Sequence, residues 1–184
     1  GTPDYEEAKT ALEQVSGFEL VDYANLWGQG NENNNEFIFA FDYQQDQAGN
    51  FYYNFTGRAV DLESLYDDEG NPMDDFVING ASRFGPSDKT LLLMDDPNDT
   101  RRDNFIRLYD DGNVHFPYQA GETSYKGSVL QKFLGIVGDD GARKSYNNIP
   151  LYRYADVVLL LAEAKNNLQE DPSAEINLVR QRAY

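Results

Sequence analysis

The stretch from Gln44 to Ser128 constrains the fold more than any other part of this 184-residue sequence. Glycine, aspartate, asparagine and proline interrupt it every few residues, so no period of 2 or 3.6 continues beyond short pieces such as Val60 to Tyr66 and Thr90 to Met94. Neither a long amphipathic helix nor a set of long alternating strands fits this pattern. We expect long ordered loops instead, because the stretch is rich in aromatic residues and disordered segments are poor in them.

Regular elements are predicted before this stretch. A Thr-Pro start and apolar residues at helical spacing predict a helix from Pro3 to Ser16, and a second short helical segment is predicted from Asp22 to Trp27. The segment from Glu36 to Tyr43 alternates with a period of two, which predicts a buried strand. On one face of that strand lie Phe37, Phe39, Phe41 and Tyr43, and on the other lie Ile38 and Ala40.

A helical hairpin is predicted at the C-terminal end. Its second helix opens at Asp171-Pro172, a pair that favours a helix start. In the first helix Leu159 and Leu160 lie off the main apolar stripe, which predicts burial against elements on two sides. The inward-facing residues are predicted to be Leu151, Tyr154, Val158, Leu161 and Leu168 in the first helix and Ile176, Val179 and Ala183 in the second.

The formal net charge of −17 excludes several classes of partner. Nucleic-acid binding takes its affinity from clustered Lys and Arg, and the sequence contains no such cluster. Anionic lipid surfaces and polyanionic substrates are disfavoured by the same repulsion, whereas a neutral sugar polymer is not. Neutral ligands are therefore the class that the charge leaves open.

Cysteine is absent, which excludes disulfides, thiolate metal sites and cysteine nucleophiles but does not fix the redox compartment. The longest strongly apolar run, from Val157 to Ala162, is far shorter than the roughly 20 residues that a membrane-spanning helix needs. We therefore expect this chain itself to be soluble.

The C-terminal segment resembles the closing helices of SusD-like (RagB-type) proteins. Those proteins carry a P-x-x-RYADV-LL-x-AEA helix followed by an A-x-x-x-IN-x-VR-x-RA helix. Pro150 to Ala164 fits the first pattern, and Ala174 to Ala183 fits the second with an altered lead-in. Upstream, Ser16 to Phe41 resembles the family's sG-x-y-L…N-x-x-E-x-IF segment and Asn98 to Arg101 resembles its nDxR element. These matches follow the expected order along almost the whole chain.

The resemblance implies a mainly α fold with long irregular loops and a few short β-strands, α+β by content, as in the C-terminal part of the tetratricopeptide-scaffolded SusD-like fold. We expect one such domain over residues 1–184. Family members carry further helical pairs and a lipoprotein signal before the matched part, so we expect the chain to be a C-terminal portion without them. Exposed helix faces would then favour self-association of the isolated chain.

The function implied by the resemblance is capture of glycans at the outer-membrane surface of Bacteroidetes-type cells and their delivery to a SusC-type TonB-dependent transporter. A lipid anchor outside this chain would hold the protein at the surface. No bond is broken in that role, so no enzyme activity is expected. Two alternatives remain: a glycoside hydrolase that uses two aspartates between Asp67 and Asp99, and a structural module that binds only protein.

Glycan binding needs aromatic rings that stack on sugar faces and polar side chains that bond ring hydroxyls. The best cluster of both kinds is the loop from Asn50 to Arg58, although one face of an extended segment there could equally belong to a core. Three aromatic residues elsewhere are secondary candidates, each of which also suits a packing role. The predicted ligand-binding residues are Trp27, Tyr52, Tyr53, Asn54, Arg58, Tyr118 and Tyr125.

A buried ion network is predicted in the C-terminal helices rather than a catalytic site. Arg153, Asp156 and Glu163 fall on one side of the first helix, within reach of Arg180 or Arg182 of the second.

Three groups of carboxylates, at Asp67 to Glu69, Asp74-Asp75 and Asp95 to Asp99, are interpreted as solvated turns. Calcium binding is the alternative that they leave open, although none matches an EF-hand loop, and sequence neighbours do not establish the carboxyl separation of a glycosidase. His115 is the only histidine, which argues against a catalytic triad or a zinc site. We expect no catalytic residue, no metal site and no cofactor.

Overall fold

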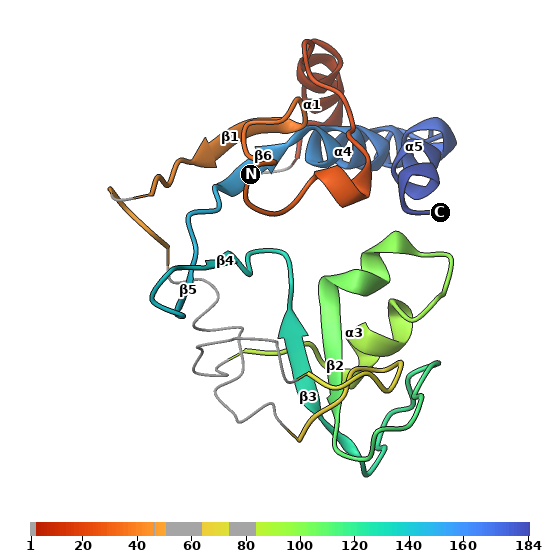
Figure 1. Cartoon of the computed structure of the whole chain (residues 1–184). Coiled ribbons are helices and arrows are strands. Elements are labelled where there is room, and N and C mark those ends of the chain that lie inside the picture. Colours follow the sequence, from red (N-terminus) through yellow and green to blue (C-terminus); the bar gives the residue numbers. More distant parts are fainter. Residues whose placement is uncertain (1–2, 46, 51–63, 74–83) are drawn as a thin grey trace. The chain divides into compact units, whose positions relative to one another are not determined.

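The chain forms two compact units. The structure is a computed structural model in which residues 3–45, 47–50, 64–73 and 84–184 are described (Figure 1). Residues 1–26, 31–42 and 148–184 make up the first, the helical unit, and residues 27–30 and 43–147 the second, the loop unit. The mixture of helices and short strands confirms the expected fold class, while the single domain over residues 1–184 stays a prediction.

The helical unit is built around helix α4 (Tyr154–Asn167), which packs against α1 (Tyr5–Glu13) and α5 (Ser173–Ala183). A short 3-10 helix, η1 (Tyr23–Asn25), follows α1. Strand β1 (Phe37–Phe41) pairs antiparallel with β6 (Ile149–Arg153), which leads directly into α4 (Figure 1).

Helix α4 begins at Tyr154, so the prediction that Leu151 lies in this helix is wrong. The segment before it is strand β6, which contains Pro150. Proline disfavours a helical conformation in the residue that precedes it and keeps the chain extended there. Arg153 has the extended conformation of an N-cap, and its N–H donates to the carboxylate of Asp156 at 2.9 Å. This cap fixes the start of the helix.

Strand β1 is not the buried strand that was predicted, because Phe39 and Phe41 are 54% and 53% exposed. The register of β1 against β6 shifts between Phe37 and Phe39 and again between Phe39 and Ala40. Such irregularities break the strict alternation of faces that the sequence pattern assumes. The aromatic face of the strand is therefore only partly covered by the described residues of this unit.

Small residues form the buried side of α4, where Ala155, Val158 and Ala162 are almost fully covered. Leu159 and Leu160 are 45% and 51% exposed, in agreement with the exposed helix faces that were expected of this chain. In α5 the prediction holds for Ala183, which is buried, but Ile176 is exposed. Within this unit α4 contacts α1 and α5, which leaves the positions of Leu159 and Leu160 open.

We expect the isolated chain to self-associate through these apolar helix positions. Leu160 on α4 and Leu178 on α5 are each about half exposed, and burying a leucine is worth roughly 1.5–3 kcal/mol. Leu160→Glu combined with Leu178→Glu should therefore weaken self-association at least about tenfold, measured by sedimentation equilibrium. Asn166→Glu, on an exposed polar position of α4, should leave it unchanged. If both variants self-associated equally strongly, Leu160 and Leu178 would not be part of the self-association interface.

The loop unit contains helix α3 (Asp88–Leu93), the 3-10 helix η2 (Thr100–Asn104) and two antiparallel strand pairs. Strand β2 (Phe105–Tyr109) pairs with β3 (Tyr125–Leu130), and β4 (Ile136–Val137) pairs with β5 (Arg143–Lys144). The core of the unit is a cluster in which Leu108 of β2 and Val129 of β3 have no exposed surface, together with Leu65 and Met73. Among the described residues, a long irregular segment, 110–124, connects β2 to β3, as expected.

Candidate functional site

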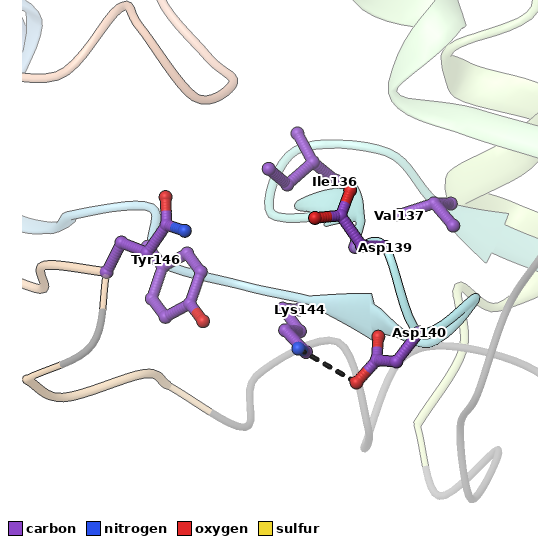
Figure 2. Close-up of a pocket in the computed structure, with 8 residues that line it drawn as sticks. Ile136, Val137, Asp139, Asp140, Lys144 and Tyr146 are labelled. Atoms are coloured by element: carbon purple, nitrogen blue, oxygen red, sulfur yellow. Dashed lines mark ion pairs between the residues drawn. The ribbon is translucent and has the colours of Figure 1, made fainter.

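A pocket of about 300 Å³ lies beside the β4–β5 hairpin of the loop unit (Figure 2). This volume is at the lower end of the range of small-molecule sites. We call it the hairpin pocket. It is lined by Gln45, Ile136, Val137, Gly138, Asp139, Asp140, Lys144 and Tyr146.

The hairpin turn brings two aspartates to the pocket. The N–H of Gly141 donates to the carbonyl of Gly138 at 2.9 Å, and the N–H of Gly138 donates to the carbonyl of Ala142 at the same distance. Gly141 has a φ of +73°, in the left-handed region that glycine adopts without strain. Asp139 and Asp140 are the central residues of this turn, so the hairpin itself positions both carboxylates.

Buried contacts at the base of the hairpin hold the opposite wall. Gly135 has a φ of +70°, and a β-carbon there would collide with the carbonyl oxygen of Lys144. The buried Arg143 donates from Nη1 to the carbonyl of Gly135 at 3.0 Å. Asn50 donates from its N–H to the carbonyl of Ser145 at 2.9 Å and from Nδ2 to the carbonyl of Asn147 at 2.7 Å. The backbone on both sides of the half-buried Tyr146 is thereby fixed.

The two carboxylates of the pocket differ in their partners. Asp140 pairs with Lys144, with 2.9 Å between Oδ2 and Nζ, and its Oδ1 accepts from the N–H of Ala142 at 3.2 Å (Figure 2). The hydrogen bond from Lys144, supported by the one from Ala142, lowers the pKa of Asp140. Asp139 is exposed and forms no hydrogen bond or ion pair with the described residues. Among the described lining residues, two carboxylates and one ammonium give a net charge of −1.

These groups suit a ligand rich in hydroxyls. Carboxylate oxygens accept hydrogen bonds, the ammonium of Lys144 donates them, and the amide of Gln45 does both. The ring of Tyr146 offers an apolar face beside them, while Ile136 and Val137 add half-exposed apolar surface. The pocket therefore combines the two kinds of contact by which proteins bind sugars.

The described aromatic candidates from the sequence lie outside this pocket. Trp27 is half-buried, and its ring lies edge-on to that of Phe133 with 5.5 Å between the ring centroids. Lys132 Nζ lies 4.2 Å from the centroid of the Trp27 ring. Tyr118 is only 3% exposed, and its hydroxyl donates to Asp88 Oδ1 at 2.8 Å. Tyr125 packs against Tyr118 with 5.2 Å between ring centroids. Tyr52, Tyr53, Asn54 and Arg58 lie outside the described residues, so their role stays a prediction.

The hairpin turn of the pocket was not predicted, although it has a signal in the sequence. Gly138 to Gly141 reads G-D-D-G between an Ile-Val pair and the Arg-Lys pair, which is a typical hairpin turn pattern. Tyr146 carried no such signal, because its place depends on the distant Asn50.

An ion network does lie in the helical unit, and its centre is Glu36. The side chain of Glu36 has no exposed surface and accepts hydrogen bonds from Arg153 Nη1 at 3.1 Å, from the N–H of Val21 at 3.1 Å and from Arg182 Nη1. Asp156 contributes through its cap on Arg153. Of the predicted members, Glu163 and Arg180 are exposed, and neither forms an ion pair with the described residues.

A second buried ion cluster occupies the loop unit, where solvated turns were predicted. Asp68 and Asp95 are each only 9% exposed, so that interpretation is wrong for both. Arg107 of β2 pairs with Asp95 at 3.0 Å and with Asp68 at 3.8 Å, and Arg102 of η2 also pairs with both. Burial raises the pKa of Asp68 although both arginines oppose the shift. The arginines stabilise these buried carboxylates, which makes the cluster a structural feature.

Asp99 is also buried rather than solvated. Its side chain has no exposed surface, and it caps η2 by accepting from the N–H of Arg101 at 2.9 Å. The guanidinium of Arg101 binds the same carboxylate, with 2.6 Å between Nη2 and Oδ2. In the described parts of the chain, no group of three or more histidines, aspartates or glutamates is arranged to hold a metal ion.

His115 lies between two carboxylates in the segment that joins β2 and β3. Its Nε2 is 2.6 Å from Asp111 Oδ1, its Nδ1 contacts Glu122 Oε1, and its ring stacks on Tyr109 with 3.8 Å between centroids. A neutral imidazole has only one N–H, so it can donate to just one of the two carboxylates. Burial lowers the pKa of His115, but the hydrogen bonds to Asp111 and Glu122 outweigh it and raise the pKa overall.

Stability should therefore depend on pH through His115. Because its folded pKa is raised, the stability it contributes is complete below its unfolded pKa of about 6.5 and is lost as the pH rises through the folded value. The melting temperature should fall by a few degrees between pH 6 and pH 8.5, and His115→Gln should remove that fall. His115 is the only histidine, so the comparison isolates one group. Parallel pH curves for the two proteins would contradict this role.

At acidic pH, Asp111 should make the stability of the protein depend on pH in the opposite direction, so that stability falls as the pH falls. Hydrogen bonds from Asn113 and then His115 lower the pKa of Asp111 to about 2. Its contribution to stability is present above the unfolded value of about 3.9 and is lost as the pH falls toward 2.

No helix among the described residues has the length and apolar content needed to cross a membrane. The SusD family model matches residues 21–184 of the chain. Comparison with curated proteins gave no match.

Several solved structures are similar to the chain. NanU of Bacteroides fragilis is 32% identical with a TM-score of 0.81, over 98% of this chain and 38% of that one. A SusD superfamily protein from Bacteroides vulgatus is 30% identical with a TM-score of 0.80, over 98% and 39%. Surface glycan-binding protein A from Bacteroides thetaiotaomicron, solved in complex with laminarihexaose, is 23% identical with a TM-score of 0.62, over 97% and 43%. The last likeness is one of fold alone, and the chain spans about two fifths of the length of these structures.

Proposed function

The chain belongs to the SusD family, and from that premise we propose that it binds oligosaccharide or polysaccharide at the bacterial cell surface, without cleaving it, for delivery to a SusC-type TonB-dependent outer-membrane transporter. The lipid anchor and the contacts with the transporter belong to the whole protein and are part of this proposal. No cofactor is needed for such a role.

The observation that carries the proposal is the hairpin pocket. It presents the ring of Tyr146 together with hydrogen-bonding groups of both kinds, from Lys144 and the two aspartates. A sugar ring has an apolar face and a rim of hydroxyls, which these groups complement. The fold is shared with a surface glycan-binding protein that was solved in complex with laminarihexaose, which adds support.

The chemistry of the pocket favours binding over hydrolysis. Glycosidases pair a carboxylate with a carboxylic acid whose raised pKa keeps it protonated. Lys144 and the N–H of Ala142 instead lower the pKa of Asp140, which makes it a poor proton donor. Asp68 and Asp95, from the region of the alternative hydrolase, are engaged by arginines.

Tyr146→Ala should weaken glycan binding roughly five- to tenfold, because one ring stacked on a sugar contributes about 1 kcal/mol beyond its buried area. Affinity electrophoresis against soluble polysaccharides, followed by calorimetry with the best ligand, would measure it. Tyr152→Ala is the control, since Tyr152 is an exposed tyrosine of the helical unit that does not line the pocket. Tyr52→Ala and Tyr53→Ala test the predicted loop in the same assay.

Three outcomes would contradict the proposal. Equal binding by Tyr146→Ala and the wild type would remove the hairpin pocket from the binding site. Release of reducing ends, abolished by an Asp→Asn change, would support a hydrolase. Binding of the transporter without binding of any glycan would support a module that binds only protein.

A further inference from the structure

We infer that Asp139 makes the hairpin pocket selective for uncharged sugar residues and excludes sugars that carry carboxylate or sulfate groups. This inference rests on the proposed function and assigns a ligand class to the same pocket.

The charges of the described residues that line the pocket do not cancel. Lys144 neutralises Asp140, since the two form an ion pair at 2.9 Å in which both side chains are about half exposed. Asp139 forms no ion pair with the described residues, and no dashed line reaches it in Figure 2, so its negative charge at the pocket is not neutralised by them. An anionic substituent that enters the pocket meets this charge, whereas a hydroxyl meets a good hydrogen-bond acceptor.

Movement of Lys144 toward an anionic ligand would not remove the repulsion between that ligand and the pocket. The space around the ion pair is narrow, because a β-carbon on Gly138 would lie 3.1 Å from Asp140 Oδ1 and 3.3 Å from Lys144 Nζ. If Lys144 turned toward an anionic ligand, it would leave Asp140 unneutralised in the same pocket. The described lining residues would then still carry two carboxylates and one ammonium, with a net charge of −1.

The whole chain adds to the local effect. Its formal charge of −17 gives a negative potential around the protein, which lowers the local concentration of anionic ligands at low salt. A change at Asp139 alters the pocket locally, while a change at a distant carboxylate alters only this general potential. The two contributions are therefore separable by mutation.

A matched pair of ligands tests the inference. A neutral polysaccharide that the protein binds is compared with the same polysaccharide oxidised at C6 to the carboxylate, so that the backbone stays constant. The wild type should bind the oxidised form more weakly, by about fivefold for one charge at roughly 4 Å in water. Asp139→Asn should remove most of that difference, measured as the ratio of the two affinities, because asparagine suits the same turn position and keeps a side-chain acceptor without the charge.

Glu13→Gln is the matched control. Glu13 is an exposed carboxylate of α1 in the helical unit, so this variant loses the same formal charge away from the pocket. It should bind both ligands as the wild type does. The difference between the ligands should also shrink when the salt is raised to 0.5 M, because exposed charges are screened.

The outcomes separate this inference from the proposed function. If no glycan is bound by the wild type, the proposed function fails. If the wild type binds both ligands equally, or if Asp139→Asn changes nothing, glycan binding stands and the selectivity assigned to Asp139 is overturned. Tighter binding of the oxidised form by the wild type would overturn it as well.

Discussion

Replacing Glu36 with alanine should lower the free energy of unfolding by about 3–5 kcal/mol, because it leaves two arginines without their buried partner. The carboxylate of Glu36 is fully buried and accepts from Arg153, Arg182 and the N–H of Val21. The side chains of Arg153 and Arg182 are themselves only 20% and 10% exposed, so water replaces the lost partner poorly. Urea denaturation followed by circular dichroism would measure the loss.

The size of the loss follows from the position of Glu36 in the helical unit. It stands immediately before β1, while Arg153 ends β6 and Arg182 lies in the last turn of α5. One carboxylate therefore ties together three segments that are far apart in the sequence. Its loss should loosen the contact of α5 with the rest of the unit as well as the strand pair.

Three variants check this explanation. Glu36→Gln keeps the shape and one acceptor, so it should lose less than Glu36→Ala. Asp156→Asn weakens an exposed cap and should cost only about 0.5–1 kcal/mol. Glu36→Ala combined with Arg182→Met should cost less than the sum of the two single changes, because the second change removes a charge that the first left unpaired. A loss under 1 kcal/mol for Glu36→Ala would show that Glu36 is not the centre of the network.

Local patterns predicted the helices of the helical unit well. The apolar spacing of α4 and α5 reflects contacts within one or two turns, and the capping residues lie beside the helices that they cap. Asp4, for example, accepts from the N–H of Glu7 at 3.0 Å at the start of α1. Such signals are readable because both partners are neighbours in the sequence.

Strand β2 was missed because a charged residue interrupts its apolar pattern. Arg107 is 1% exposed and lies between the partly buried Ile106 and the fully buried Leu108. A period-two reading treats such an arginine as a solvent-facing residue and finds no buried strand. The burial of Arg107 is explained by its ion pairs with Asp68 and Asp95, which the sequence pattern does not reveal.

The ion network and the pocket also depend on contacts between residues far apart in the sequence, which local patterns do not predict. Arg153 and Asp156 were predicted from their spacing on one helix, but Glu36 is 117 residues from Arg153 and 146 from Arg182. The N-x-x-E-x-IF match already contained Glu36, although a motif does not name the partner of its glutamate. The G-D-D-G turn was likewise readable, while the wall formed by Tyr146 depends on a contact with Asn50.

Arg107→Met should be as damaging in the loop unit as Glu36→Ala is in the helical unit, with an expected loss of about 3–5 kcal/mol. Its guanidinium pairs with Asp95 at 3.0 Å and with Asp68 at 3.8 Å. Methionine fills similar space, so the loss reports on the charges rather than on a cavity. Arg102 remains as the other described partner of both carboxylates.

The loss at Arg107 should also depend on pH, which distinguishes it from a packing defect. The pKa of Asp68 is already raised by burial, and the variant removes one of the two arginines that oppose this shift. A raised folded pKa means that the folded state takes up the proton first, so the penalty should be largest at neutral pH and shrink as Asp68 becomes protonated. Lys126→Ala, which breaks an exposed pair with Asp110, should cost about 0.2–1 kcal/mol. If Arg107→Met cost no more than this control, or the same at pH 5 and pH 7.5, the buried cluster would not depend on charge compensation by Arg107.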